Sequence, residues 1–240
     1  MDKSKIKGII FDYGATIDTN GRHWKDVLWD AYIEQQIPVS RDAFYEAYVY
    51  GERYLATHEI VSPEDDFLSV LLAKTHLQAH WLIERGFLEN NALSSFYPLA
   101  VSVQCNKFVL NILKNTIPVL EKLALQYHLV LVSNFYGNIE TVLKDFGLDL
   151  FFKKIIESAV VKIRKPDPAI FALGVEALGL SPEEVVVVGD SHSKDIVPAQ
   201  KLGCQTIWLK GSAWEDDFSG QGMIDVVITD FSELEKLLLN

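Results

Sequence analysis

The chain has 240 residues, of which 49% are hydrophobic, so it is long enough for one large packed core or for a core with an insertion. It carries 33 acidic and 22 basic residues, a net charge of −11, and its lysines and arginines form no obvious cluster in the sequence. This composition excludes an unstructured chain and argues against binding to nucleic acids or anionic membranes, because phosphate groups attract basic clusters.

The two cysteines and the N-terminus indicate where the protein resides. Cys105 and Cys204 are far apart in the sequence, as expected of two separate buried thiols in a reducing compartment. The charged segment Met1–Lys7 lacks the apolar stretch of a signal peptide, and no segment approaches the ~20 apolar residues of a spanning helix. We therefore expect a soluble cytoplasmic protein with no membrane partner; the sequence leaves its oligomeric state undetermined.

The first structural signal is a strand followed by a long helical stretch. The short apolar run Gly8–Phe11 predicts a strand buried on both faces. No further strand-like run occurs between Asn20 and about Leu113. Apolar spacing and capping residues there predict four helices, over His23–Gln36, Ser40–Thr57, Ser62–Gly86 and Leu99–Lys114.

The rest of the chain alternates strands with helices. Apolar runs predict strands at Leu129–Val132, Lys154–Ile156 together with Val160–Val161, Val185–Val188, Thr206–Leu209 and Val226–Ile228. Helical patterns lie at Pro168–Leu178, Ile196–Leu202 and Glu233–Leu239. This alternation predicts an α/β fold, with a parallel sheet covered by helices on both faces.

Four short segments contain the candidate functional residues. They are Phe11–Asp18, Leu131–Asn134, Arg164–Pro168 and Val188–Asp195. Three of them follow or end an apolar run, and ligands of a parallel sheet bind outside the carboxyl ends of its strands. We therefore expect side chains from all four segments to line one crevice.

The residue types in these segments suit phosphoryl chemistry. The Asp12 carboxylate can attack phosphorus and bind Mg²⁺ through its second oxygen. The Ser133 hydroxyl and nearby backbone amides suit a phosphoryl oxygen. Together with Asp12, the pair Asp190 and Asp195 supplies three negative charges and Lys165 supplies one positive charge. One Mg²⁺ would bring that sum to zero.

The four segments, in this order, resemble the motifs of the haloacid dehalogenase-like hydrolase superfamily. The position of the helical stretch is similar to that of the subfamily with a helical cap inserted between the first and second motifs. The resemblance implies a Rossmann-like parallel sheet core, with a strand order like 5-4-1-2-3, over residues 1–18 and 114–240. It implies an α-helical cap over residues 19–113.

The resemblance also implies a function and a role for each candidate residue. The function is that of a Mg²⁺-dependent phosphomonoesterase acting on a small phosphorylated metabolite. The implied roles are nucleophile for Asp12, phosphate binding for Ser133, Asn134 and Lys165, and metal binding for Asp12, the Gly14 carbonyl and Asp190. Asp195 is expected to be either a metal ligand through water or a neighbour that orients the ligands. Lys165 is also expected to pair with the nucleophile.

One position departs from the family pattern. Phosphatases of this family carry Asp-x-Asp-Gly-Thr in the first motif, whereas this chain has Asp12-Tyr13-Gly14-Ala15-Thr16. Gly14 therefore replaces the usual acid/base carboxylate, a loss that typically slows a reaction by about 10²–10⁴-fold. Tyr13 and His23 are two candidates for a substitute.

Two other functions stay open at this stage. One is a carbon–halogen hydrolase of the 2-haloacid dehalogenase type, in which Asp12 would attack carbon without a metal. In the family, those enzymes carry an aromatic residue at the position of Gly14. The other is a non-catalytic binding protein on the same fold, compatible with Gly14 and with the acidic surface.

Overall fold

The computed structural model describes residues 1–211 and 224–239. Residues 212–223 and 240, which the predicted core also includes, lie outside the described part. The strands are β1 (Gly8–Phe11), β2 (His128–Ser133), β3 (Phe152–Glu157), β4 (Val185–Gly189), β5 (Gln205–Leu209) and β6 (Val226–Ile228). The helices are α1 (Trp24–Glu34), α2 (Arg41–Thr57), α3 (Phe67–Glu84), α4 (Tyr97–Ala124), α5 (Ile139–Asp145), α6 (Ser158–Val161), α7 (Ala169–Leu178), α8 (Val197–Lys201) and α9 (Glu233–Leu239).

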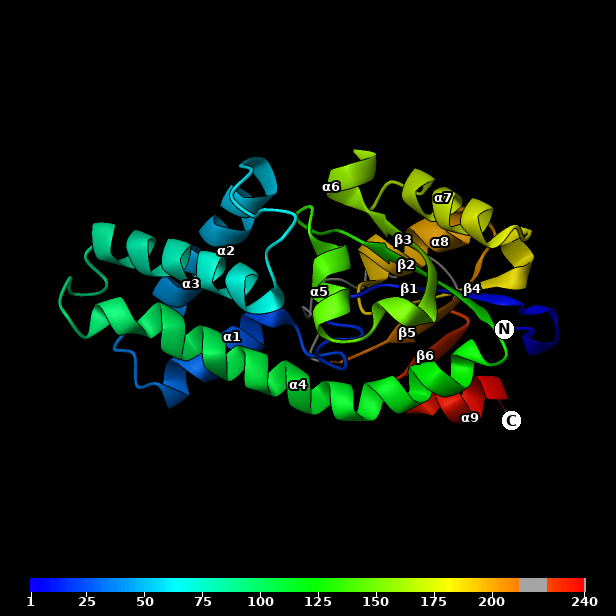
Figure 1. The fold of residues 1–240 in the computed structure, drawn as a ribbon, viewed down its shortest axis with the longest axis horizontal. Coiled ribbons are helices and arrows are strands. Elements are labelled where there is room, and N and C mark those ends of the chain that lie inside the picture. The colour runs from blue at the N-terminus through cyan, green and yellow to red at the C-terminus, as the bar shows by residue number, and fades with distance from the viewer. Residues whose placement is uncertain (212–223, 240) are drawn as a thin grey trace.

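The six strands form one parallel sheet in the order β3-β2-β1-β4-β5-β6. The predicted α/β class and parallel sheet are confirmed, and β6 adds one strand beyond the five of the expected order. Strand β1 lies at the centre, where Ile9 is paired with Leu129 of β2 and with Val186 of β4. All six carboxyl ends therefore point in one direction, toward the helices α1–α3 (Figure 1).

The two faces of the sheet bury separate apolar cores because side chains alternate along each strand. Ile10 lies with Phe171 and other α7 side chains on one face. Ile9 and Phe11 lie on the opposite face, in a larger cluster that includes Leu120 of α4 and continues into the helical segments. Both faces of β1 are buried, as the uninterrupted apolar run predicted.

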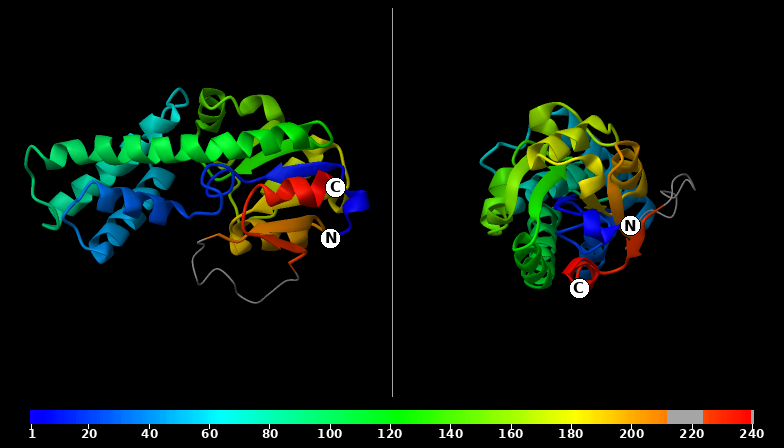
Figure 2. Two further views of the ribbon diagram at one scale, coloured as in Figure 1. Left: turned by 90° about the horizontal axis from the view of Figure 1, so that it is seen from below. Right: turned by 90° about the vertical axis from the view of Figure 1, so that its right-hand side faces the viewer.

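Helices α1–α3 and the N-terminal half of α4 form a lobe beyond the carboxyl edge of the sheet, which we call the helical lobe (Figure 1). Helix α4 runs the length of the molecule, from this lobe to the side of the sheet (Figure 2). The helix predicted to end at Lys114 therefore continues to Ala124. The apolar stripe continues through Leu113 and Leu120, on either side of the exposed Pro118. The expected border between residues 113 and 114 thus falls inside a continuous helix, and the division into core and cap stays a prediction.

The start of α3 differs from the prediction. Ser62 does not begin the helix; its amide donates to Asp65 Oδ2 at 2.8 Å within a turn. The helix begins at Phe67, where Asp66 caps it by accepting from the Ser69 amide at 2.8 Å. The sequence contains two capping residues within five positions, Ser62 and Asp66, and the second is the one used.

The pair Val160–Val161 is helical rather than part of a strand. These residues end α6, and Lys162 follows in the left-handed region with φ 59°. Val160 is 67% exposed, so its β-branched side chain has no sheet to pack against. The prediction failed here because the apolar pair is too short to distinguish a strand from a single helical turn.

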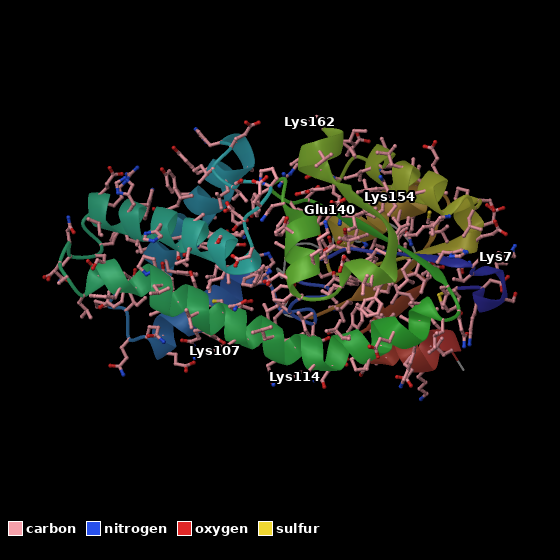
Figure 3. The ribbon with its side chains drawn as sticks, viewed as in Figure 1. Lys7, Lys107, Lys114, Glu140, Lys154 and Lys162 are labelled. Atoms are coloured by element: carbon pink, nitrogen blue, oxygen red, sulfur yellow. The ribbon has the colours of Figure 1, made fainter. Side chains whose placement is uncertain are left out.

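Charged side chains occupy the outside of the molecule (Figure 3). The five lysines marked there are exposed and spread over separate parts of the surface: Lys7, Lys107, Lys114, Lys154 and Lys162. Lys154 lies on β3, an edge strand, where a charged side chain discourages pairing with a further strand. None of the helices in the described part of the chain is long and apolar enough to cross a membrane.

A stability prediction follows from the turn after β1. Ala15 has φ 64°, a left-handed conformation that favours glycine over residues with a Cβ atom. We expect Ala15→Gly to raise the free energy of unfolding by about 0.5–1 kcal/mol. The matched control is Ala172→Gly on the exposed face of α7, expected to lower it by about 0.5–1 kcal/mol. Urea denaturation measures both, and equal destabilisation would contradict the strain at Ala15.

Candidate functional site

A cavity of about 450 Å³ lies between the carboxyl edge of the sheet and the helical lobe. The core contributes residues from each of the four sequence segments: Asp12, Gly14, Ser133, Asn134, Lys165, Asp190 and Asp195. The helical lobe and the segment leading to it contribute His23, Trp24, Tyr48, Glu52, Phe67, Val70, Leu71 and Lys74. The structure therefore brings every candidate site residue into one cavity.

Lys165 links two of the carboxylates directly. Its Nζ lies 2.6 Å from Asp12 Oδ1 and 2.8 Å from Asp195 Oδ1, and the residue is only 5% exposed. Burial acts to lower the pKa of Lys165, but the two carboxylates outweigh it and raise that pKa above its usual value. The ammonium is therefore charged, and it holds Asp12 in a fixed orientation.

Asp12, Asp190 and Asp195 can present three oxygen atoms within 4.8 Å of one another. Burial and neighbouring carboxylates raise the pKa of Asp190 well above its usual value, and burial raises the pKa of Asp195 to about 6. With Lys165 the group carries a formal charge of −2 when all three carboxyls are ionised. Hard oxygen donors with that charge fit a divalent cation such as Mg²⁺.

The local backbone explains how Asp195 reaches this cluster. It lies in a π-helical turn, His192–Ile196, between β4 and α8, and its Oδ2 accepts from the Ser191 amide at 3.1 Å. A Cβ atom on Gly189 would lie 2.6 Å from the Asp195 carboxyl. Only glycine at the end of β4 therefore allows the carboxyl to pack against the strand.

Asn134 holds the segment that carries Lys165. Its Oδ1 accepts from the Lys165 amide at 3.0 Å, and its Nδ2 donates to the Lys165 carbonyl at 3.2 Å. The Asn134 side chain is thus occupied by the backbone, whereas Ser133, at the end of β2, has its hydroxyl-bearing side chain on the cavity. Asn134 fits a positioning role better than the direct phosphate contact predicted for it.

The comparison with known proteins identifies the family. Residues 88–209, just over half of the chain, match the haloacid dehalogenase-like hydrolase family. The chain belongs to this family. The resemblance drawn from the four motifs is therefore confirmed.

Three similar proteins illustrate the range of this family. A glyceraldehyde 3-phosphate phosphatase of Pyrococcus furiosus is 36% identical over 92 residues, 38% of each chain, so the match spans well under half of that relative. A phosphatase structure of this family from Thermococcus onnurineus is 25% identical over 97% of this chain and 98% of its own, with a TM-score of 0.55. A dehalogenase structure is 18% identical over 98% of both chains, with a TM-score of 0.65, a likeness that concerns the fold alone.

Gly14 leaves open space where many haloacid dehalogenase-like hydrolases carry a carboxylate. Gly14 lines the cavity, and a Cβ atom built on it would meet no atom within 4 Å. Its backbone φ is not in the left-handed region, since it is absent from the positive-φ residues of the described chain. A side chain at position 14 would therefore fit without strain.

The two predicted substitutes for that carboxylate differ in position. Tyr13 is fully buried against Phe135, with ring centroids 5.8 Å apart, and it does not line the cavity. His23 does line the cavity, but burial lowers its pKa to about 4, so its ring is neutral at neutral pH. Tyr13 is therefore wrong as a candidate, and His23 has no proton to give as an imidazolium.

Asp18, which the sequence analysis quoted but gave no role, also lines the cavity. It is 1% exposed; its Oδ1 accepts from the Ala15 amide at 2.7 Å and its Oδ2 from Trp24 Nε1 at 2.8 Å. Burial raises the pKa of Asp18 to about 7, against the lowering effect of these two hydrogen bonds. The signal available in the sequence was its place in the first motif segment, six residues after Asp12.

A second polar cluster on the lobe side was not predicted at all. Lys74 Nζ lies 2.8 Å from Glu52 Oε1, and the Tyr136 hydroxyl donates to Glu52 Oε2 at 2.9 Å. Burial acts to raise the pKa of Glu52, but Lys74 outweighs it and holds that pKa below its usual value. Tyr136 follows β2, so this cluster joins two helices of the lobe to the sheet. The signal available in the sequence was Lys74, a charged residue on the same buried face of α3 as the apolar Leu71.

The buried carboxyl of Asp18 predicts a pH dependence of stability. Its pKa is about 7 in the folded protein and near 3.8 when unfolded, so between these values the folded state binds the extra proton. Stability should then fall as pH rises from about 4 to 7, by up to about 1.4 kcal/mol per pH unit. Asp12 and Lys74 act on the same carboxyl, raising and lowering its pKa respectively.

Comparison with Asp18→Asn isolates this contribution. The variant loses one hydrogen-bond acceptor at all pH values, and its side chain does not titrate. The difference in unfolding free energy between the two proteins should therefore change steadily between pH 4 and 7. Urea denaturation at each pH measures it. A difference that is constant with pH would mean that Asp18 is ionised throughout.

Proposed function

We propose that the protein is a Mg²⁺-dependent phosphomonoesterase that acts on a small phosphorylated metabolite through an aspartyl-phosphate at Asp12. The observation that carries the proposal is the buried Lys165 ammonium, which fixes the Asp12 carboxylate at 2.6 Å beside two further acids in one cavity. In this proposal residues 1–18 and 114–240 are the catalytic core and residues 19–113 the cap. Both cysteines are buried free thiols, in keeping with the reducing cytoplasm in which we propose it acts.

The residues at the carboxyl edge fit a magnesium ion. Asp12, Asp190 and the backbone carbonyl of Gly14 would hold it, and Asp195 would orient this group from its bond to Lys165. When bound, Mg²⁺ supplies the positive charge that offsets the carboxylates and the phosphoryl oxygens. Gly14 would bind the metal through its backbone carbonyl. The lack of a side chain at this position therefore removes no ligand from the proposed metal site.

The remaining groups position the reaction. An oxygen of Asp12 attacks phosphorus while Lys165, with two of its three N–H donors held by carboxylates, directs the third toward a phosphoryl oxygen. The Ser133 hydroxyl donates to another phosphoryl oxygen. Asn134 keeps the Lys165 backbone in register through its paired hydrogen bonds. Phosphoryl transfer depends mainly on positioning and electrostatics of this kind.

The relatives and the cavity support a small substrate. The segments matched in the curated relatives belong to enzymes named for glyceraldehyde 3-phosphate and phosphoserine. A cavity of about 450 Å³ lies in the range of small-molecule sites. The proposal is therefore a small phosphorylated metabolite, with no nucleic-acid or membrane partner.

The three carboxylates also separate this function from its alternatives. Attack of Asp12 on a carbon–halogen bond needs one nucleophilic carboxylate, and two further acids beside it would only add repulsion unless a cation were bound. Halide release in the presence of EDTA would favour that chemistry. Binding of phosphate and Mg²⁺ without turnover of any phosphate ester would favour a non-catalytic binding protein.

The first test concerns the nucleophile. Asp12→Asn keeps the shape of the side chain but removes its nucleophilic charge, so we expect turnover of 4-nitrophenyl phosphate to fall to the uncatalysed background. The matched control is Asp42→Asn on the exposed start of α2, expected to keep wild-type turnover. Phosphate release with Mg²⁺ present measures both. Turnover retained in Asp12→Asn would overturn the aspartyl-phosphate mechanism.

The second test concerns the metal. A Mg²⁺ concentration 100 times the dissociation constant should stabilise the protein by about 2.7 kcal/mol and raise the melting temperature by roughly 5–10 °C. Asp190→Asn should remove most of this shift, whereas Asp42→Asn should keep it. Thermal melts across a Mg²⁺ titration give the result without any substrate. An equal shift in wild type and Asp190→Asn would reject the assigned ligands.

A further inference from the structure

We propose that Asp18 is the general acid and base of the reaction, in place of the side chain that position 14 lacks. This inference rests on the proposed function, because it assigns a proton-transfer role within the same phosphoester hydrolysis. Asp18 lies in the first motif segment, and the family resemblance assigns no role to its position. Three features support this assignment: the shape of the turn after Asp12, the donors around the Asp18 carboxyl, and the bonds or metal-binding roles of the other acids among the described cavity residues.

The turn after Asp12 brings position 18 back beside position 14. The Tyr13 carbonyl accepts from the amides of Thr16 at 3.2 Å, Ile17 at 2.9 Å and Asp18 at 3.4 Å. These bonds, together with Ala15 at φ 64°, fold the segment back on itself in a tight turn. Gly14 and Asp18 accordingly both line the cavity.

The Asp18 carboxyl is held at the edge of the space that Gly14 leaves. Its Oδ1 is 2.7 Å from the amide of Ala15, the residue next to Gly14. A Cβ atom on Gly14 would meet no atom within 4 Å, so this space is open rather than filled by another side chain. A leaving-group oxygen on a phosphate attacked by Asp12 can enter that space.

The surroundings of Asp18 keep its proton available. Both of its oxygens accept from neutral N–H donors, and the ion pairs formed within residues 1–211 and 224–239 do not include it. Asp12, by contrast, is paired with Lys165 at 2.6 Å. Burial raises the pKa of Asp18 to about 7, with a further rise from Asp12 and a lowering from Lys74. Two carboxyls whose surroundings differ in this way can divide the roles of nucleophile and acid.

The other ionisable groups of the cavity are less suited to the role. Asp195 is bound to Lys165 at 2.8 Å, and Glu52 is bound to Lys74 at 2.8 Å. Asp190 also lines the cavity, but it is one of the proposed magnesium ligands. His23 is neutral at neutral pH because burial lowers its pKa to about 4. Asp18 is thus the carboxyl of the described cavity residues that combines an open neighbouring space with neutral hydrogen-bond donors.

The proposed proton transfers balance over the two steps. In the first, an Asp12 oxygen forms a bond to phosphorus, the bond from phosphorus to the ester oxygen breaks, and that oxygen takes the proton of the Asp18 carboxylic acid and leaves as the alcohol. In the second, the Asp18 carboxylate takes a proton from water while the water oxygen bonds to phosphorus. The bond between phosphorus and Asp12 then breaks, its electron pair returns to the Asp12 carboxylate, and inorganic phosphate leaves. Asp18 ends the cycle protonated, as it began.

The test compares Asp18→Asn with wild type on two substrates with different leaving groups. Glycerol 2-phosphate releases an alcohol that needs the proton, whereas 4-nitrophenyl phosphate releases a stable phenolate. We expect kcat/KM to fall about 10²–10⁴-fold for the first and less than tenfold for the second. Because the second step loses its base with either substrate, kcat should fall for both. The variant should then release 4-nitrophenolate in a burst, with labelled phosphate retained on Asp12.

Two further variants keep the test decisive if Asp18→Asn is poorly folded. Trp24→Phe removes one donor to Asp18 but keeps the acid, so the limb of the kcat/KM pH profile assigned to Asp18 should move to higher pH. The double variant Gly14→Asp/Asp18→Asn places a carboxyl in the open space. Its kcat/KM for glycerol 2-phosphate should be at least tenfold higher than that of Asp18→Asn alone. A purely structural role for Asp18 predicts neither the shifted limb nor the rescue.

The outcomes also separate this inference from the proposed function. Wild-type protein that hydrolyses neither substrate with Mg²⁺ present would overturn the proposed function itself. Wild-type hydrolysis with an equal fall of kcat/KM for both substrates in Asp18→Asn, no burst and no rescue by Gly14→Asp, would leave the phosphatase standing and reject Asp18 as its acid. Unequal falls together with the burst and the rescue support the assignment.

Discussion

The site depends on one buried ammonium. Lys165 lies between Asp12 and Asp195, and its positive charge offsets the repulsion between these buried carboxylates. Without it, three acids would repel one another at close range, and each would favour its protonated form. An unpaired carboxylic acid is a poor nucleophile, so the same ion pair that stabilises the local structure also keeps Asp12 reactive in the proposed chemistry. The paired hydrogen bonds between Asn134 and the Lys165 backbone belong to this arrangement because they fix the backbone position from which the Lys165 side chain extends.

The parallel sheet explains why this much of the site could be predicted from the sequence. Asp12, Ser133 and Asp190 each follow a short apolar run, and runs buried on both faces can form only the interior strands of such a sheet. Parallel strands end at one edge, so the order of the motifs was enough to bring these side chains together. Lys165 joins them from the loop between α6 and α7. Because this loop does not directly follow a strand, the role of Lys165 in the site was expected from the family resemblance.

What the sequence did not predict depends on contacts between elements. The ion pair of Lys74 with Glu52 joins α3 to α2, and no spacing within one helix reports which residue faces another helix. Tyr13 was a reasonable substitute acid by proximity to Asp12, yet its ring is fully buried against Phe135 and does not line the cavity. Helix α4 passes Pro118 because the proline faces solvent, which local rules for proline cannot foresee. These three failures concern the direction of a side chain, whereas the error at Val160–Val161 concerned the type of element.

The gap at position 14 and the acid at position 18 are best understood together. A carboxylate at both positions would place two like charges four residues apart in one tight turn of a buried site, and each would raise the pKa of the other. The chain avoids this repulsion by carrying glycine at one position and aspartate at the other. The donors to Asp18, the Ala15 amide and the Trp24 indole, are neutral, so they orient the carboxyl without forcing it to ionise. A strong cationic partner, like the one that Asp12 has, would hold Asp18 ionised and leave it no proton to transfer. The two carboxyls are buried to a similar degree, and they differ in their partners: a cation for Asp12 and neutral N–H groups for Asp18.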